Sequence, residues 1–110
     1  MRIDELIDAL NETGVPFVRD AWVEAPAGDY GVVSMEGEPM ALWGDDHMVA
    51  QRCLCSVYLY SRDGRDDVPA AVNAILNASD VIFAIMSREY LPDLNMIRWQ
   101  WRVTLEQYFG

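Results

Sequence analysis

Apolar and polar residues recur along this chain with two different periods, and each period predicts one type of element. From Ile3 to Leu10 the apolar residues fall at helical spacing, with acidic residues on the opposite side. This pattern predicts an amphipathic helix over residues 2–13. Gly14 and Pro16 follow directly and are typical of a helix end.

The next part of the chain is rich in short extended segments. Residues 15–18 are expected to form a short edge strand, because Pro16 cannot donate a hydrogen bond to a neighbouring strand. Residues 30–35 are predicted to form a strand, which the Gly and Pro within residues 36–39 close as a turn. Residues 40–43 then return as its partner.

The middle of the chain holds a long strand and a second helix. Residues 47–60 are rich in Val, Cys, Leu and Tyr, with a mostly apolar face at the odd positions, and this predicts a long central strand. Asp66 or Asp67 is a suitable cap for a helix that runs to about residue 78 with one apolar side.

The last segments predict an antiparallel strand pair over residues 81–108, connected at residues 91–95. Residues 81–86 are apolar at both alternating sets of positions, which is typical of a strand covered on both sides or lying beneath helices. From Ile97 to Leu105 apolar and polar residues alternate strictly, so this strand is expected to have one buried and one wet face.

These elements predict an α+β fold with a single, mostly antiparallel sheet and two helices packed on one face, in the order α-β-β-β-α-β-β. A length of 110 residues fits a single domain over 1–110, since domains commonly have about 100–150 residues. With 52% hydrophobic residues the chain is expected to fold.

Charge narrows the classes of partner. The chain has 18 acidic residues against 8 basic ones, and every basic residue is Arg. A net charge of −10 makes nucleic-acid binding improbable, because nucleic acids are held mainly by cationic side chains, and it disfavours an anionic membrane surface. The start carries two acids within five residues and resembles no signal peptide, so we expect a soluble protein in the cytoplasm.

Candidate catalytic chemistry is sparse. His47 is the single histidine, and its functional interpretation as a base or metal ligand is weaker than its interpretation as an ordinary loop residue. Adjacent side chains in Asp45-Asp46-His47 diverge, so they suit no metal site. Cys53 and Cys55 are expected to be free, buried thiols on one face of a strand. We therefore expect no enzymatic activity, no cofactor and no metal, with a small enzyme based on His47 as a remote alternative.

Aromatic and basic residues supply candidates for contact with a partner. Trp99 and Trp101 lie on the apolar face of the last strand and are expected in the core, whereas Trp22, Tyr30 and Trp43 lie beside loops. Those three are candidates for partner contact, with packing under a loop as an equally good alternative.

Two arginines on the wet face of the last strand are further candidates. Arg98 and Arg102 are placed to pair across a subunit boundary, although a plain solvated face is the more frequent outcome. The following residues complete the candidate interface: Met40, Leu42, Asp45 and Asp46.

The order of segments resembles a known family. It combines Gly14-Val15-Pro16-Phe17-Val18 after the first helix, a strand from Tyr30 to Met35, and Trp43-Gly44-Asp45-Asp46-His47-Met48-Val49-Ala50-Gln51. Cys55-Ser56-Val57-Tyr58-Leu59-Tyr60-Ser61, an acid-capped helix and a final strand pair follow. This arrangement resembles the small tail-component proteins of tailed phages and prophages, of the tail-terminator or head–tail joining type.

The resemblance implies a structural subunit without enzymatic activity. Such a subunit assembles with copies of itself into a ring, expected to be hexameric, at the head-proximal end of the tail tube, where it meets other tail and head–tail connector proteins. It would reside in the cytoplasm of a bacterial host during assembly and then in the virion. An acidic lumen wall would let DNA slide past without binding it.

Ring closure requires two different complementary patches on each subunit. The predicted loop at residues 36–46, where Met40, Leu42 and Trp43 lie among acids, is a candidate for one of them. The alternative function is a small acidic inhibitor or immunity-type protein that presents carboxylates to a basic partner.

Overall fold

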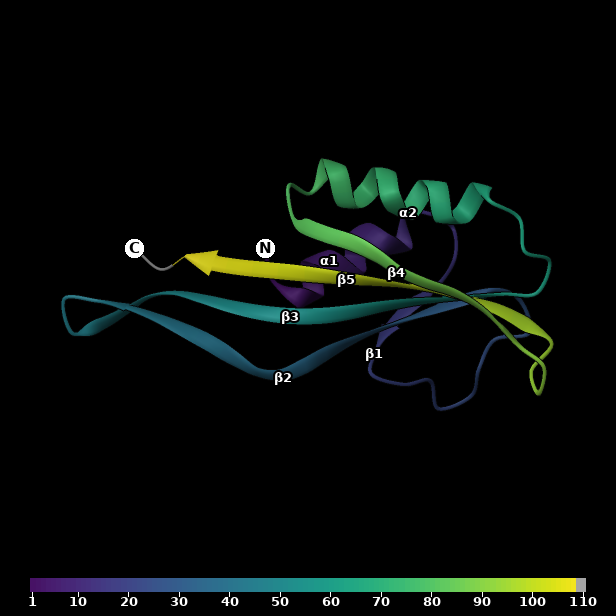
Figure 1. Cartoon of the computed structure of the whole chain (residues 1–110), viewed down its shortest axis with the longest axis horizontal. Coiled ribbons are helices and arrows are strands. Elements are labelled where there is room, and N and C mark those ends of the chain that lie inside the picture. The colour runs from purple at the N-terminus through teal and green to yellow at the C-terminus, as the bar shows by residue number, and fades with distance from the viewer. Residues whose placement is uncertain (109–110) are drawn as a thin grey trace.

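Five strands form one sheet, and two helices lie on one of its faces, in a computed structural model that describes residues 1–108 (Figure 1). The strand order is β1-β2-β3-β5-β4; β1 is parallel to β2, and the other neighbours are antiparallel. The predicted fold class and element order are therefore confirmed. The elements are α1 (Ile3–Asn11), β1 (Phe17–Arg19), β2 (Tyr30–Gly44), β3 (His47–Ser61), α2 (Asp67–Ala78), β4 (Ile82–Leu91) and β5 (Met96–Tyr108).

The first helix forms where its spacing predicts it. Its buried side carries Ile3, Leu6 and Leu10, and the Glu5 carboxylate accepts a hydrogen bond of 3.2 Å from the backbone N–H of Arg2. Gly14 follows the helix end with a φ of +88°, a conformation that glycine adopts readily. Within residues 1–108, neither helix has the length and apolar character needed to cross a membrane.

The core lies between the helices and the covered face of the sheet. Val33, Val57 and Trp101 are adjacent in neighbouring strands and have no exposed surface. From the helices, Leu6 and Leu76 are equally buried in the same cluster. The prediction of one buried face from the strict alternation on β5 is therefore confirmed. The opposite face of the sheet carries no helix and is called here the open face (Figure 1).

The long strand over residues 47–60 is confirmed as β3, which lies between β2 and β5. Both cysteines on it are free thiols, as expected from their spacing; Cys55 is fully buried as predicted, whereas Cys53 is only half-buried. Burial raises the pKa of the Cys55 thiol to about 12, with a further contribution from Cys53. Cys55 therefore packs as a small apolar residue.

The predicted turn at residues 36–39 and the return strand at 40–43 were wrong, and the loop expected at 36–46 is mostly strand. β2 continues to Gly44 and pairs with β3 on both sides of a bulge, in which Gly37, Glu38 and Pro39 lie opposite Cys53. Gly37 supplies a φ of +71° there, and Pro39 is tolerated because no strand of the described residues 1–108 pairs with the outer edge of β2 at this point.

The expectation that residues 81–86 are covered on both sides was also wrong. β4 is the last strand of the sheet, and Ile82 and Ile85 are 72% and 54% exposed. The apolar side of α2, with Val72 and Leu76, packs on the central part of the sheet, so that Phe83 is half-buried against the core and most of β4 is left exposed. The apolar residues on both faces of β4 therefore belong to an edge strand and not to a strand in the interior of the sheet.

Gly31 on β2 is required by the close approach of β1. A Cβ built at this position would lie 2.1 Å from two ring carbons of Phe17. We expect Gly31→Ala to lower the free energy of unfolding by about 1–3 kcal/mol, measured by chemical denaturation, because the ring cannot move without disturbing the core. Gly28→Ala, where nothing lies within 4 Å, is the matched control. Equal stability of the two variants would contradict this packing.

Candidate subunit interface

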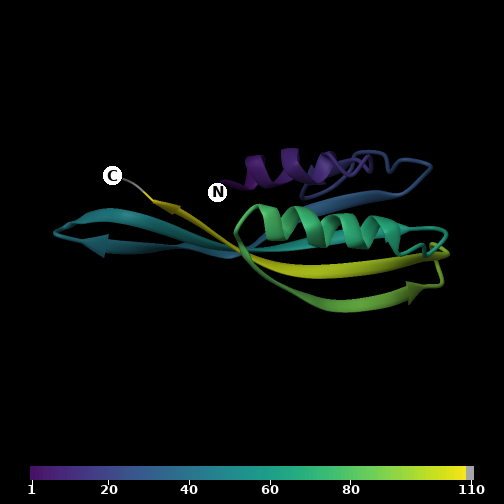
Figure 2. The ribbon, with the colours of Figure 1, turned by 90° about the horizontal axis from the view of Figure 1, so that it is seen from above.

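The outer half of the β2–β3 hairpin, residues 36–54, is called here the arm. Figure 2 shows it extending well beyond both helices, and it contributes to a longest dimension of 52 Å in a molecule only 26 and 21 Å across. β5 accompanies β3 as far as the pair Ala50 and Tyr108, so among the residues that the structure describes the outermost part is a ribbon of two strands. A two-stranded ribbon is at best marginally stable in water without further packing.

The outer part of β2 on the arm carries a cluster of apolar residues. Met40 pairs with Arg52, Leu42 with Ala50, and Trp43 with Met48. Met40 and Leu42 lie on the open face, because paired residues share a face and their partners on β3 are spaced by two. The register shifts between Leu42 and Trp43, and consecutive residues of β2 point to opposite faces, so Trp43 lies on the other face of the arm. Met40 and Trp43 are 60% and 69% exposed. The arm patch is Met40, Leu42 and Trp43.

Two carboxylates occupy the arm's tip. Asp45 and Asp46 form the turn with φ values of +50° and +66°, the backbone sign that a two-residue hairpin turn requires. His47 is exposed beside them, with Nδ1 3.1 Å from the carbonyl oxygen of Asp45. No group of three or more His, Cys, Asp or Glu side chains within residues 1–108 is arranged to hold a metal.

The candidate arginines lie on the open face of β5, and each has a partner within its own chain. Arg98 donates to Glu89 at 3.2 Å and lies 5.3 Å from the ring centroid of Tyr58. Arg102 lies 3.6 Å from Glu36. Burial opposes the charge of Arg98, but hydrogen bonds to Tyr60 and Glu89 outweigh it and raise the pKa of this guanidinium.

Trp22 and Tyr30 pack together near the far end of β2 from the arm patch. Their ring centroids are 6.3 Å apart, and Tyr30 stacks on Tyr60 at 4.9 Å. Trp22 Nε1 donates to the carbonyl oxygen of Gly31 at 3.1 Å. Trp22 and Tyr30 thus fix the loop between β1 and β2 against the open face, whereas Trp43 has no such role. The structure therefore separates the candidates into two groups.

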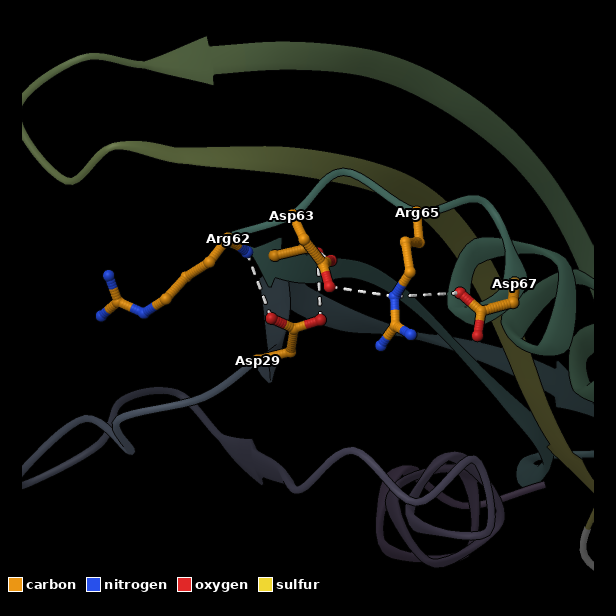
Figure 3. Close-up of polar contacts among 6 residues, drawn as sticks. Asp29, Arg62, Asp63, Arg65 and Asp67 are labelled. Atoms are coloured by element: carbon orange, nitrogen blue, oxygen red, sulfur yellow. Dashed lines mark hydrogen bonds and ion pairs between the residues drawn. The ribbon is translucent and has the colours of Figure 1, made fainter.

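A network at the opposite end of the sheet was missed from the sequence (Figure 3). Asp29 accepts hydrogen bonds from the Arg62 backbone and from the Ser61 hydroxyl, at 3.1 and 3.0 Å. Arg65 lies 2.9 Å from Asp63 and 4.0 Å from Asp67. Alternation of acids with arginines over residues 62–67 is the signal that points to it. The network ties the β1–β2 loop to the start of α2.

Glu106 on β5 joins the base of the arm to the rest of the sheet. It accepts hydrogen bonds from Arg52 Nε at 2.9 Å and from the Tyr108 hydroxyl at 2.5 Å. These bonds lower the pKa of the Glu106 carboxyl below its usual 4.5, and the bond from Tyr108 makes the largest contribution.

We expect a pH-dependent contribution of Glu106 to stability. A carboxyl whose pKa is lowered in the folded state stabilises the fold above the unfolded pKa, and this contribution disappears as the pH falls through the folded pKa. Glu106→Gln is therefore expected to be less stable than the native chain at pH 7, with the gap closing below pH 4.5. Denaturation at several pH values, with Glu24→Gln in the exposed loop as control, measures it. A gap independent of pH would contradict this.

Comparison with known proteins gives structural likeness only. No protein-family model matches the chain, and no curated protein matches it by sequence. A crystal structure of a protein from Akkermansia muciniphila aligns with 98% of this chain and 48% of that one, at 12% identity and a TM-score of 0.54. The chain thus spans about half the length of that protein. At this identity the likeness shows the fold alone.

A second solved structure is also similar. It is described as the virion of a native gene transfer agent particle, and the alignment covers 97% of this chain and 89% of that chain. The identity is 19% and the TM-score 0.49.

Proposed function

We propose that this chain is a structural subunit, without catalytic activity, that assembles with copies of itself into a closed ring in a particle of the tailed-phage type. Within such a particle we propose the role of tail terminator or head–tail joining protein. Its partners would be the other tail and connector proteins, and its final place the head-proximal end of the tail. The order of segments that resembles this family supports the choice of particle.

The single observation that carries the proposal of assembly is the exposed apolar patch on the arm. Trp43 and Met40 are 69% and 60% exposed on a ribbon that no helix covers. Large aromatic residues of this kind are over-represented where subunits meet and dominate the binding energy of interfaces. Such an arm gains its packing when a partner covers it.

The position of the arm favours a ring over a two-fold dimer. The open outer edge of the arm belongs to β2, on the β1 side of the sheet, whereas the uncovered apolar strand β4 lies at the other side. Two different patches on opposite sides of one subunit make a heterologous contact, which closes into a ring when the rotation between subunits allows it.

The acidic inhibitor remains a second candidate, since a net charge of −10 would attract a basic partner. Two of the acids near the start of α2, Asp63 and Asp67, lie, however, within ion-pair distance of Arg65. A monomer that binds a basic enzyme with strong salt dependence would favour the inhibitor.

Electron microscopy of tails tests the proposed role. Purified tail tubes mixed with this chain are expected to carry one ring of added density at one end, and the added protein is expected to block binding of further tube subunits there. Trp43→Ala protein serves as the interface variant and Val23→Ala, altered at a fully exposed loop residue, as its control. Tubes with bare ends at saturating protein would contradict the role.

A further inference from the structure

The uncovered strand β4 is the second unusual surface of the molecule. Ile82, Ile85, Met86 and Tyr90 are exposed by 72%, 54%, 48% and 58%. Residues apolar at both alternating sets of positions are typical of strands buried on both faces. A long exposed apolar edge strand pairs readily with another chain. β4 thus has the composition of an interior strand in the place of an edge strand.

The arm has a matching free edge. β1 pairs with β2 only at Gly31–Val33, so within residues 1–108 the outer edge of β2 is unpaired beyond that point. Pro39 has no N–H to donate, and the bulge around Gly37 interrupts the edge. The segment able to accept a neighbouring strand is therefore Met40–Gly44, which is also the segment that carries the arm patch.

We propose that Met40–Gly44 of one subunit adds as a strand to the outer edge of β4 in a second copy of this chain. This inference rests on the proposed ring and names the two surfaces that close it. Because β2 and β4 lie on opposite sides of the β3–β5 pair, every subunit gives one strand edge and receives another. The sheet then continues from subunit to subunit and buries exposed apolar side chains of both strands.

Length and charge support a second copy as the occupant. Five arm residues extend about 17 Å, and the ten residues of β4 extend about 33 Å, so the edge of β4 accommodates the whole segment. The arm is acidic, with Glu38, Asp45 and Asp46 exposed. Arg88 on β4 is exposed, and its guanidinium carbon lies 5.2 Å from the ring centroid of Trp99. Within residues 1–108 it forms no ion pair. It is placed to meet the arm's carboxylates.

Cross-linking between two single-cysteine variants tests this pairing. Both variants carry Cys53→Ala, which leaves the fully buried Cys55 as the remaining native thiol. One has Leu42→Cys on the arm and the other Ala84→Cys on β4, both on the open face; a short bismaleimide then joins cysteines that lie on the same face of adjacent strands. The matched control replaces Ala84→Cys by Ala74→Cys, on an exposed position of α2.

We expect the Leu42→Cys and Ala84→Cys pair to cross-link at least tenfold faster than the control pair. An oligomer in which both pairs react equally would overturn the inference and leave the proposed ring intact. Dominant cross-linking of Ala84→Cys with itself would overturn it in favour of a two-fold β4 pairing. A chain that stays monomeric under all conditions would overturn the ring as well.

Hydrogen exchange gives an independent readout on the native chain. Amide protons on an unpaired strand edge exchange with solvent, and pairing with another strand protects them. On assembly, protection is expected to rise in β4 and in Met40–Gly44 together. Protection that rises elsewhere and leaves β4 unchanged would overturn the inference.

Discussion

Replacing Trp101 by Ala is expected to lower the free energy of unfolding by about 3–5 kcal/mol, since removal of a buried aromatic side chain leaves a large cavity. Trp101 has no exposed surface and lies at the centre of β5, beneath α2. Its Nε1 also donates to Asn73 of α2 at 2.8 Å. The substitution therefore removes both the packing and the hydrogen bond that hold α2 to the sheet.

Chemical denaturation with Trp101→Phe as the matched variant separates these two contributions. Trp101→Phe keeps most of the buried area and removes the donor, so its expected loss is smaller, about 1–2 kcal/mol. Near-native stability of Trp101→Ala would contradict the central place of this residue in the core.

Replacing Trp43 by Ala is expected to have the opposite profile, with a large effect on assembly and almost none on folding. The side chain is 69% exposed, so the free energy of unfolding of the monomer is expected to change by less than about 0.5 kcal/mol. Truncation of an aromatic anchor at an interface costs about 2 kcal/mol or more, which is about 30-fold in the dissociation constant of each contact.

Sedimentation of Trp43→Ala beside Val23→Ala measures this effect. Val23 is a fully exposed apolar residue in the β1–β2 loop, and its replacement is expected to change neither folding nor assembly. Equal dissociation constants for the two variants would show that the arm patch is not an interface.

Periodicity predicted the elements whose surroundings lie within the chain. The alternation on β5 and the helical spacing on α1 both identify a buried side, because each packs on the core of the same molecule. The interior position of β3 also followed from its length and composition.

The predictions that failed concern the edges of the sheet. Gly37 and Pro39 indicate a turn in isolation, but an edge strand absorbs both in a bulge because its outer hydrogen bonds are not used. For residues 81–86, apolar character shows that a strand is to be covered and does not show what covers it. A neighbouring subunit leaves the same pattern as a helix of the same chain.

The candidate interface was predicted residue by residue but not as a surface. Loops and aromatic residues suggested Trp22, Tyr30 and Trp43 together, and only the pairing register shows that the first two pack within the subunit while Trp43 lies apart on the arm. The apolar pattern of β4 is the same as that of a strand buried within one chain, so the sequence could not show that β4 is exposed.

Native mass measured by light scattering, from micromolar to millimolar concentration, tests assembly most directly. We expect a stable oligomer whose mass approaches that of a hexamer, and a shift toward the monomer mass of 12.5 kDa in Trp43→Ala at the same concentration. A native chain that stays at the monomer mass over the whole range, or an oligomer that Trp43→Ala leaves unchanged, would contradict assembly through the arm.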